Sequence, residues 1–159
     1  MSEKSKSADK FCGDAEAGIY DALLLQNQLC FPLYAVSKEV VRLYKPFLDE
    51  IGLTYTQYIA MMVLWEKRTA TVKELGERLY LDSGTLTPLL KKMEAQGFVS
   101  RQRNAADERS VIVSLTQAGE ALKERAANIP AQIGNCLPLT GGESETLYKL
   151  LYKVLRAIE

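Results

Sequence analysis

An apolar stripe at helical spacing indicates a short helix in the middle of the chain. Val72, Leu75 and Leu79 recur every three or four residues, so they share one face of a helix. Residues 71–74 are Thr-Val-Lys-Glu, a capping box in which the Thr hydroxyl and the Glu carboxylate satisfy free N–H groups at a helix start. The pattern therefore predicts a capped helix that buries this face.

A second helix is predicted directly after a polar turn. Residues 80–84 offer Asp82 or Ser83 as the residue that caps the new helix. Leu86, Leu90 and Met93 then follow at spacings of four and three, so they are expected to point inward. The opposite face is small and neutral to basic, and it carries Gly84, Thr87, Pro88, Lys91 and Lys92. Such a face can approach a DNA major groove closely.

The next segment is predicted to form a hairpin. Two β-rich runs, residues 98–103 and 110–115, flank a polar tip at residues 104–109. Arg109 can reach a narrow minor groove, where the potential is most negative, and Asp107 can hold its guanidinium in a charge-assisted pair. The alternative is a small solvated hairpin with surface charges. Its position directly behind two helices joined by a turn favours the DNA reading, so residues 75–115 are predicted to form a winged helix-turn-helix.

The second helix of this motif, over residues 83–96, is expected to be the recognition helix. The residues predicted to contact DNA are Ser83, Gly84, Thr85, Thr87, Pro88, Lys91, Lys92, Asp107 and Arg109. Residues 82–109 carry five cationic and four anionic side chains, a net charge of only +1. Tight binding is therefore expected to need a dimer, which adds a second half-site, and backbone N–H contacts to phosphate.

Both ends of the chain carry amphipathic helices. The first has a stripe of coiled-coil character, made of Leu29, Leu33, Val36, Val40, Leu43 and Phe47. Pro46 is expected to kink or end this helix. A capping box at residues 140–143 starts the last helix, whose stripe is Leu147, Leu151, Val154 and Ile158. These stripes either cover the core of their own subunit or form a dimer seam. The seam is favoured, because a protein with one recognition helix gains a second half-site by dimerising.

Two further helices complete a mostly α-helical fold with a small β-hairpin wing. Thr54 is predicted to cap a densely apolar helix that runs through Trp65. Thr116 is predicted to cap a helix that is broken at Pro130 and carries Leu122, Ala126 and Ile129. We expect a partly disordered tail over residues 1–26 and a dimerisation helix over 27–53. The DNA-binding domain is expected over 54–115, and C-terminal dimerisation helices over 116–159.

Composition excludes several classes of protein. The 159 residues include no histidine, so neither a zinc site nor Ser-His or Cys-His catalysis is expected. The ten glycines are scattered and predict no phosphate-cradling loop. No apolar run is long enough to cross a membrane, and no signal peptide opens the chain. A cytoplasmic protein without membrane contact, metal, cofactor or enzymatic activity is therefore predicted.

The three cysteines, Cys12, Cys30 and Cys136, have no CxxC spacing and do not suggest a disulfide framework. Cys30 precedes Pro32, a residue tolerated near a helix start, so Cys30 is expected in or just before the first helical turn. The positive end of the helix dipole favours the thiolate there, and the thiolate is the reactive form. The alternative is an inert small apolar residue, and helix position alone does not decide between the two.

Five segments carry a family resemblance: 29–31 (Leu-Cys-Phe), 44–46 (Tyr-Lys-Pro), 55–58 (Tyr-Thr-Gln-Tyr), 79–88 around the second helix start, and 107–110 (Asp-Glu-Arg-Ser). Together they resemble the organic hydroperoxide resistance regulators, which belong to the MarR (multiple antibiotic resistance regulator) family. The resemblance runs without gaps from about residue 27 to the chain end. It implies a MarR-type winged helix-turn-helix homodimer that binds double-stranded operator DNA.

The resemblance also implies that Cys30 is a peroxide-sensing thiol, whose oxidation by an organic hydroperoxide releases the repressor from DNA. Tyr44 and Tyr55 match tyrosines that donate hydrogen bonds to the sensing sulfur across the dimer, and Tyr34 matches a neighbour of that pocket. Phenolic O–H groups stabilise a thiolate without adding charge. The alternative for each tyrosine is a filler of the core or the interface.

Cys136 lies between the last two predicted helices, where two-cysteine members of the family place a resolving thiol. The resemblance therefore implies that oxidised Cys30 forms a disulfide with Cys136 of the partner subunit. The alternative for Cys136 is a buried cysteine at a loop edge. Cys12 lies outside the matched region, and no role is expected for it. Two other functions stay open: a repressor released by a small phenolic ligand without thiol chemistry, and a thiol peroxidase, whose active-site motif the chain does not resemble.

Overall fold

A computed structural model describes residues 20–104 and 107–158, without the side chains of Glu108 and Arg109. The predicted tail up to residue 19, including Cys12, lies outside the described residues. The chain divides into two compact units, Met1–Arg42 and Leu43–Glu159, and each is described by itself. The first contains η2 (Asp21–Leu23), η3 (Leu25–Asn27) and the start of α1 (Cys30–Glu50).

The second unit continues with α2 (Tyr55–Lys67), β1 (Thr69–Thr71), α3 (Val72–Leu79) and α4 (Ser83–Ala95). The hairpin strands β2 (Val99–Asn104) and β3 (Asp107–Leu115) follow. Three helices then complete the chain: α5 (Gln117–Ala126), α6 (Ile129–Cys136) and α7 (Gly141–Ala157). The fold is mostly α-helical with a small antiparallel sheet, as predicted.

The helix-turn-helix has the predicted caps and the predicted buried face. Thr71 and Glu74 form the capping box of α3, and the Asp82 side chain caps α4. Leu75 of α3 is fully buried, and Val72 and Leu79 pack against the core beside it. The inward residues of α4, namely Leu86, Leu90 and Met93, are all at most 1% exposed. Tyr80 turns the chain between these helices in the left-handed conformation, at φ 55°.

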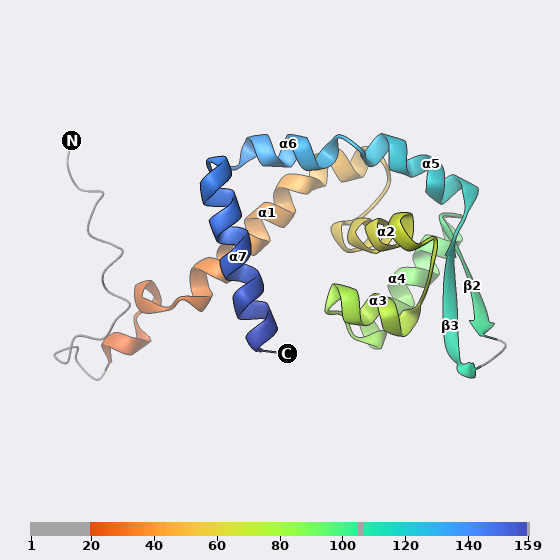
Figure 1. The fold of residues 1–159 in the computed structure, drawn as a ribbon, viewed down its shortest axis with the longest axis horizontal. Helices are drawn as coiled ribbons and strands as arrows, with labels where there is room; N and C mark the ends of the chain where they lie inside the picture. Colours follow the sequence, from red (N-terminus) through yellow and green to blue (C-terminus); the bar gives the residue numbers. More distant parts are fainter. Residues whose placement is uncertain (1–19, 105–106, 159) are drawn as a thin grey trace. The chain divides into compact units, whose positions relative to one another are not determined.

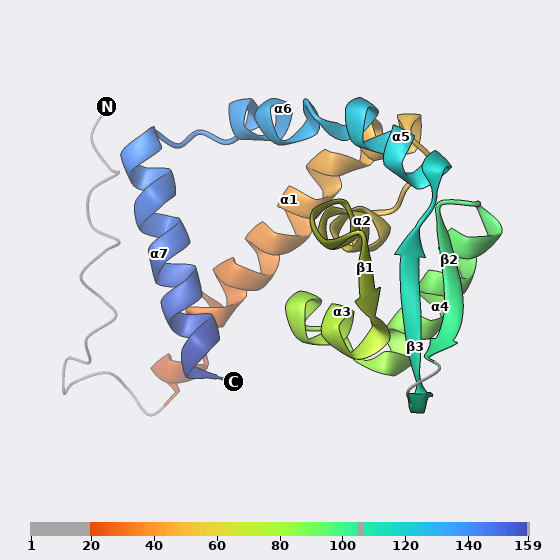
Figure 2. The same cartoon turned by 45° about the vertical axis from the view of Figure 1, so that its right-hand side comes forward.

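The sheet has the strand order β1-β3-β2, and β1 was not predicted. β1 has only three residues, too few to show an alternating pattern, and Ala70 pairs with Val113 in its centre. The strands of the hairpin pair from Val99 with Leu115 to Asn104 with Asp107, and the register shifts at Arg103 and Asn104. β3 therefore begins three residues earlier than the sequence pattern indicates. Figure 1 shows the two strands of the hairpin side by side, and Figure 2 shows the hairpin beside α4, with β1 on the other side of β3.

Two prolines were expected to disturb their helices, Pro46 by a kink or an end and Pro130 by a break. Pro46 lies inside α1, which continues to Glu50, so Pro46 does not end the helix. The helix loses the hydrogen bond that the Pro46 nitrogen cannot donate to the Arg42 carbonyl, and the following turn still forms. Pro130 does not break the helix that begins after Thr116, because that helix has already ended at Ala126. Pro130 instead lies in the first turn of α6, where a missing N–H costs nothing.

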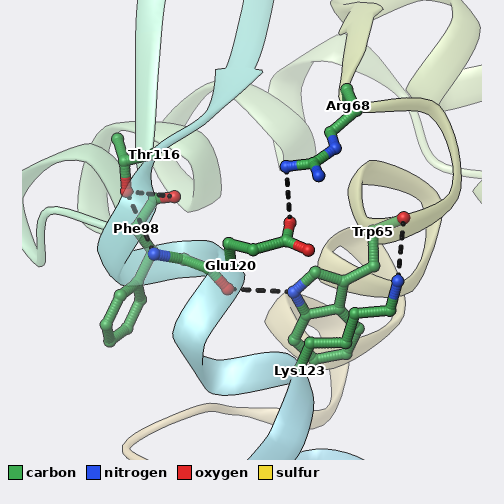
Figure 3. A network of polar contacts seen from close by, with 7 residues as sticks. Trp65, Arg68, Phe98, Thr116, Glu120 and Lys123 are labelled. Atoms are coloured by element: carbon green, nitrogen blue, oxygen red, sulfur yellow. Dashed lines mark hydrogen bonds and ion pairs between the residues drawn. The ribbon is translucent and has the colours of Figure 1, made fainter.

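A junction at the start of α5 joins three parts of the second unit (Figure 3). The Trp65 indole N–H of α2 donates to the Gly119 carbonyl over 2.9 Å. The Arg68 guanidinium pairs with Glu120 at 2.9 Å. The Thr116 hydroxyl contacts the carbonyls of Gly97 and Phe98 at 2.6 and 3.0 Å, at the base of the hairpin. The start of α5 is thereby tied both to the end of α2 and to the turn that leads into β2.

Among the described residues, no helix combines the length and the apolar character that a membrane crossing requires.

Candidate DNA-binding surface and thiol sites

The outer face of α4 is exposed as the sequence predicts. The exposed residues there are Ser83, Gly84, Thr85, Thr87, Pro88, Lys91 and Lys92. The helix is held from the opposite side, because its apolar residues are locked into the core. Two lysines and several small side chains therefore face outward on a rigid helix. This combination suits close approach to an anionic groove.

The start of α4 is organised by the Asp82 carboxylate. Its Oδ1 accepts from the Thr85 backbone N–H at 2.9 Å, and its Oδ2 accepts from the Thr85 hydroxyl at 2.8 Å. These hydrogen bonds lower the pKa of Asp82. The Thr87 hydroxyl similarly donates to the Ser83 carbonyl at 2.7 Å. Both threonine hydroxyl hydrogens are thus used within the helix, and their oxygens are left as acceptors toward a ligand.

Gly84 and Pro88 stand four residues apart in this helix. The sequence suggests that Gly84 relieves the clash between the Pro88 ring and the carbonyl of the preceding turn. The structure gives Gly84 a further reason. A Cβ at Gly84 would lie 2.9 Å from Asp82 Oδ1, so a larger residue there would require the capping carboxylate to shift. Why the recognition helix contains Pro88 has no structural explanation.

The hairpin is attached to α4 through Arg101 and Glu94. Arg101 donates its guanidinium to Glu94 Oε2 at 2.7 and 2.9 Å, and its backbone N–H to Glu94 Oε1 at 2.9 Å. Asp107, the first residue of β3, is exposed. The side chain of Arg109 lies outside the described residues, so its pairing with Asp107 stays a prediction. Sequence patterns did not indicate the Arg101–Glu94 link, because both residues fall on polar positions of their elements.

An open groove of about 910 Å³ lies between α3, α4 and β3. Ser83, Thr87 and Asp107, which were all predicted to contact DNA, line this groove. Lys73 and Glu77 of α3 line it too, although sequence reasoning assigned them no role. Their helical positions indicate only a solvated face. The groove therefore brings part of the predicted DNA-binding set together from α4 and the hairpin, and adds two residues of α3.

Four aromatic rings form a continuous series in the second unit. Tyr44 contacts Tyr55 edge to face with ring centroids 5.0 Å apart, and Tyr58 at 5.9 Å. Tyr58, which is 3% exposed, also contacts Trp65 at 6.1 Å. Burial raises the pKa of Tyr44, Tyr55 and Tyr58 above 10.0, and the neighbouring phenols raise those of Tyr44 and Tyr58 further. These phenols therefore stay protonated at neutral pH and can donate hydrogen bonds.

Tyr44 and Tyr55 were predicted from the sequence as site residues, but their aromatic neighbours Tyr58 and Trp65 were not. The spacing of Tyr58 and Trp65 by seven residues on the apolar α2 was a signal that both lie on one helix face. Tyr34 belongs to the first unit and is 64% exposed.

Both described cysteines are free and exposed. Cys30 is the first residue of α1, as predicted, and its sulfur lies 4.0 Å from Gln28 Oε1. Cys136 is the last residue of α6 and not part of the loop that follows. Exposure makes both sulfurs accessible to a small oxidant, and it contradicts the alternative that Cys136 is buried.

Known proteins with similar sequences are transcriptional regulators. The family model of the transcriptional regulators SarA/Rot matches residues 42–126. The organic hydroperoxide resistance transcriptional regulator of Bacillus subtilis strain 168 is 50% identical over 139 residues, which are 87% of this chain and 95% of that protein.

Solved structures of regulators share the fold. The structure of reduced AbfR bound to DNA, from Staphylococcus epidermidis, has a TM-score of 0.71 and 36% identity over 85% of this chain and 94% of that one. AbfR with a formed disulfide matches with a TM-score of 0.61 and 36% identity, over 85% and 93%. Reduced MarR from E. coli matches with a TM-score of 0.67 and 31% identity, over 80% and 96%. Because the half-identical relative and these winged-helix structures match over most of their length, the chain belongs to the MarR family of transcriptional regulators and shares its fold with the organic hydroperoxide resistance regulators.

Proposed function

We propose that the chain is a redox-sensing repressor that binds operator DNA as a reduced homodimer and leaves it when an organic hydroperoxide oxidises Cys30. The observation that carries this proposal is an exposed cysteine at the first position of α1, in a chain half identical to an organic hydroperoxide resistance regulator. The AbfR structures support the same class of regulator. One is reduced and bound to DNA, and another contains a disulfide.

The sensing step is a displacement on the peroxide. The Cys30 thiolate attacks one peroxide oxygen, the S–O bond forms as the O–O bond breaks, and the alkoxide leaves and takes up a proton as the alcohol. The sulfur is oxidised to the sulfenic state, and the hydroperoxide is reduced. The Cys136 thiolate of the partner subunit then attacks the sulfenic sulfur, the S–S bond forms as the S–O bond breaks, and the hydroxide leaves and takes up a proton as water.

Tyr44 and Tyr55 supply the hydrogen bonds that favour the thiolate, across the dimer, and Tyr34 borders the same pocket. In the structure the two rings are in contact, with centroids 5.0 Å apart, and burial raises the pKa of both phenols from 10.0, so each is a protonated donor at neutral pH. Oxidation replaces the thiolate as acceptor, so the hydrogen bonds must rearrange. That rearrangement is the start of the signal.

The dimer forms through the two ends of the chain. Leu29, Leu33, Val36 and Leu43 of the first stripe are between 38% and 59% exposed. The stripe of α7 is uncovered in the same way, at Leu147, Leu151, Val154 and Ile158, and α7 has no buried residue. Two stripes of large apolar side chains facing solvent are unusual for an isolated subunit. If both stripes are buried in a dimer, residues 27–53 and 116–159 form the dimer interface, and residues 54–115 form the DNA-binding domain.

Each subunit then reads one half of a palindromic operator. The outer face of α4 enters the major groove, and recognition helices of the two subunits occupy successive grooves about one helical turn apart. Lys91 and Lys92 contact phosphates beside the groove, and Arg109 inserts into the flanking minor groove. Because net charge near the motif is small, the second half-site is needed for tight binding.

The decisive experiment is an operator titration of wild type and Cys30→Ser, with and without cumene hydroperoxide. Reduced wild type and Cys30→Ser are both expected to bind, and only wild type is expected to lose the operator after peroxide. Cys12→Ser serves as the matched control and is expected to respond like wild type. A peroxide response that persists in Cys30→Ser removes Cys30 from the mechanism.

A second candidate is a repressor released by a small phenolic ligand without thiol chemistry. The groove beside α4 favours it, because a molecule held there would meet the DNA-facing residues Ser83 and Thr87. Release of Cys30→Ser from the operator by a phenolic compound, such as salicylate, would support this candidate. If no phenolic compound releases Cys30→Ser from the operator, this second candidate is excluded and the redox mechanism is retained.

A further inference from the structure

A buried amide links the first turn of α2 to the end of the recognition helix. Gln57 is 2% exposed and is the one buried polar or charged side chain among the described residues. Its Nε2 donates to Gln96 Oε1 at 3.0 Å, across 39 positions of the sequence. Gln96 caps the C-terminal end of α4, and its own Nε2 donates to the Gly52 carbonyl at 3.1 Å. These bonds connect the turn before α2, the start of α2 and the end of α4.

The same glutamine builds the start of α2. Gln57 Oε1 accepts from the Thr54 backbone N–H at 2.9 Å, and the Thr54 hydroxyl accepts in return from the Gln57 backbone N–H at 3.4 Å. Tyr55, one of the proposed thiolate donors, is the first residue of the helix that this capping box starts. Any displacement of the Tyr55 end of α2 therefore also displaces the Gln57 side chain.

Gln57 is buried and Gln96 is exposed, so the hydrogen bond between them is partly buried. An amide enclosed in apolar surroundings must keep its hydrogen bonds, because a buried donor left without an acceptor is costly. The apolar contacts between α2 and α4 can slide by small amounts, since dispersion and burial have no preferred angle. The Gln57–Gln96 hydrogen bond, in contrast, is stable only within a narrow range of lengths and angles. The end of the recognition helix must therefore follow the first turn of α2, or the bond must break.

We propose that Gln57 and Gln96 are positioning residues that transmit the state of the thiol to the recognition helix. This inference rests on the proposed redox function. Loss of the hydrogen bond from Tyr55 to the sensing sulfur releases the start of α2, and the Gln57–Gln96 bond moves the C-terminal end of α4 with it. Neither glutamine is among the residues proposed to contact the sulfur or the DNA. Their contribution is to the coupling between the two sites.

The test is the ratio of operator affinities between the reduced dimer and the dimer oxidised at Cys30 by cumene hydroperoxide. Gln96→Ala removes the acceptor for Gln57 and is expected to lower this ratio roughly tenfold, a typical size for coupling between sites. The rate of Cys30 oxidation, followed by trapping the sulfenic acid with dimedone in Cys136→Ser, is expected to stay as in the parent. A purely structural role would instead lower thermal stability and reduced-state affinity without changing the ratio.

Two variants make the result specific. Gln96→Glu keeps an acceptor for Gln57 but cannot donate to Gly52, so it is expected to retain most of the wild-type ratio. Gln117→Ala makes the same change at an exposed first-turn position of α5 and is expected to leave the ratio unchanged. A wild-type ratio in Gln96→Ala overturns the inference, as does equal loss in Gln96→Ala and Gln96→Glu. A ratio of one in wild type overturns the redox function itself, and the two failures are therefore distinguishable.

Discussion

The Glu94 carboxylate in the last turn of α4 accepts three hydrogen bonds from Arg101 in β2, and so fixes the hairpin to the recognition helix. The pair is partly shielded, since the Arg101 side chain is 23% exposed. A wing and a recognition helix that contact the same DNA need a constant angle between them. Here that angle depends on an ion pair added to the apolar packing beneath.

The first prediction follows from this pair. Arg101→Ala is expected to weaken operator binding roughly two- to fivefold, the range that a partly exposed ion pair can account for. The reason is a wing that no longer holds its angle to α4. The measurement is an operator titration at fixed salt, accompanied by hydrogen exchange at the amides of β2. Glu145→Gln, which breaks the exposed Lys149–Glu145 pair on α7, is the control and is expected to change neither. Equal affinity for wild type and Arg101→Ala would show that packing alone sets the angle.

The second prediction concerns acid. Side-chain hydrogen bonds from Arg101, above all, hold the pKa of Glu94 below its ordinary value of 4.5. The folded state therefore binds this proton less readily than the unfolded chain. The stability from the link is complete above the ordinary value and is lost as the pH falls through the lowered pKa. Urea unfolding is expected to separate wild type from Glu94→Gln at pH 7, and the difference in stability is expected to narrow as the pH falls below 4.5. A difference that does not change with pH would have a cause other than carboxylate charge.

Local features of the fold could be predicted because they depend only on residues that are close together in the sequence. The caps at Thr54, Thr71 and Thr140 hold in the structure, since each capping box needs only a four-residue pattern. The inward face of α4 follows from a spacing of four and three. Cys30 begins its helix because Pro32 fits the first turn.

The links that join elements could not be predicted in the same way. Gln57 meets Gln96 across 39 positions, and Trp65 meets Gly119 across 54. No periodic pattern connects residues so far apart, because their meeting depends on the packing of whole helices. Of the candidate site, the sequence therefore predicted which residues face outward on α4, and not the contacts that hold the helix in place. The break at Pro130 was misjudged because the effect of a proline depends on its distance from a helix end, which the pattern fixes only approximately.

The third prediction uses two glycines as a matched pair. Gly119 is buried at the start of α5, and an added Cβ would overlap the Phe98 carbonyl oxygen and lie 2.9 Å from Leu115 Cδ1. Because backbone blocks the methyl group, Gly119→Ala is expected to destabilise the protein by about 1–3 kcal/mol. At Gly134 in α6, a Cβ would meet no atom within 4 Å, so Gly134→Ala is expected to stabilise its helix by about 0.5–1 kcal/mol. Chemical unfolding measures both. Similar effects of the two substitutions would contradict the close approach of α5 to the residue that precedes β2.

The fourth prediction tests the second thiol. Cys136 ends α6 and is exposed, so its thiol lies outside the core of its own subunit. Peroxide treatment of wild type is expected to give a covalent dimer on non-reducing electrophoresis, because the proposed disulfide joins two subunits. Cys136→Ser is expected to lose this species, and Cys12→Ser is expected to retain it. If the covalent dimer persists in Cys136→Ser and disappears in Cys12→Ser, Cys12 is the resolving thiol. If oxidised Cys136→Ser still leaves the operator, the sulfenic acid alone is enough for release, and the disulfide then serves to protect Cys30 from further oxidation.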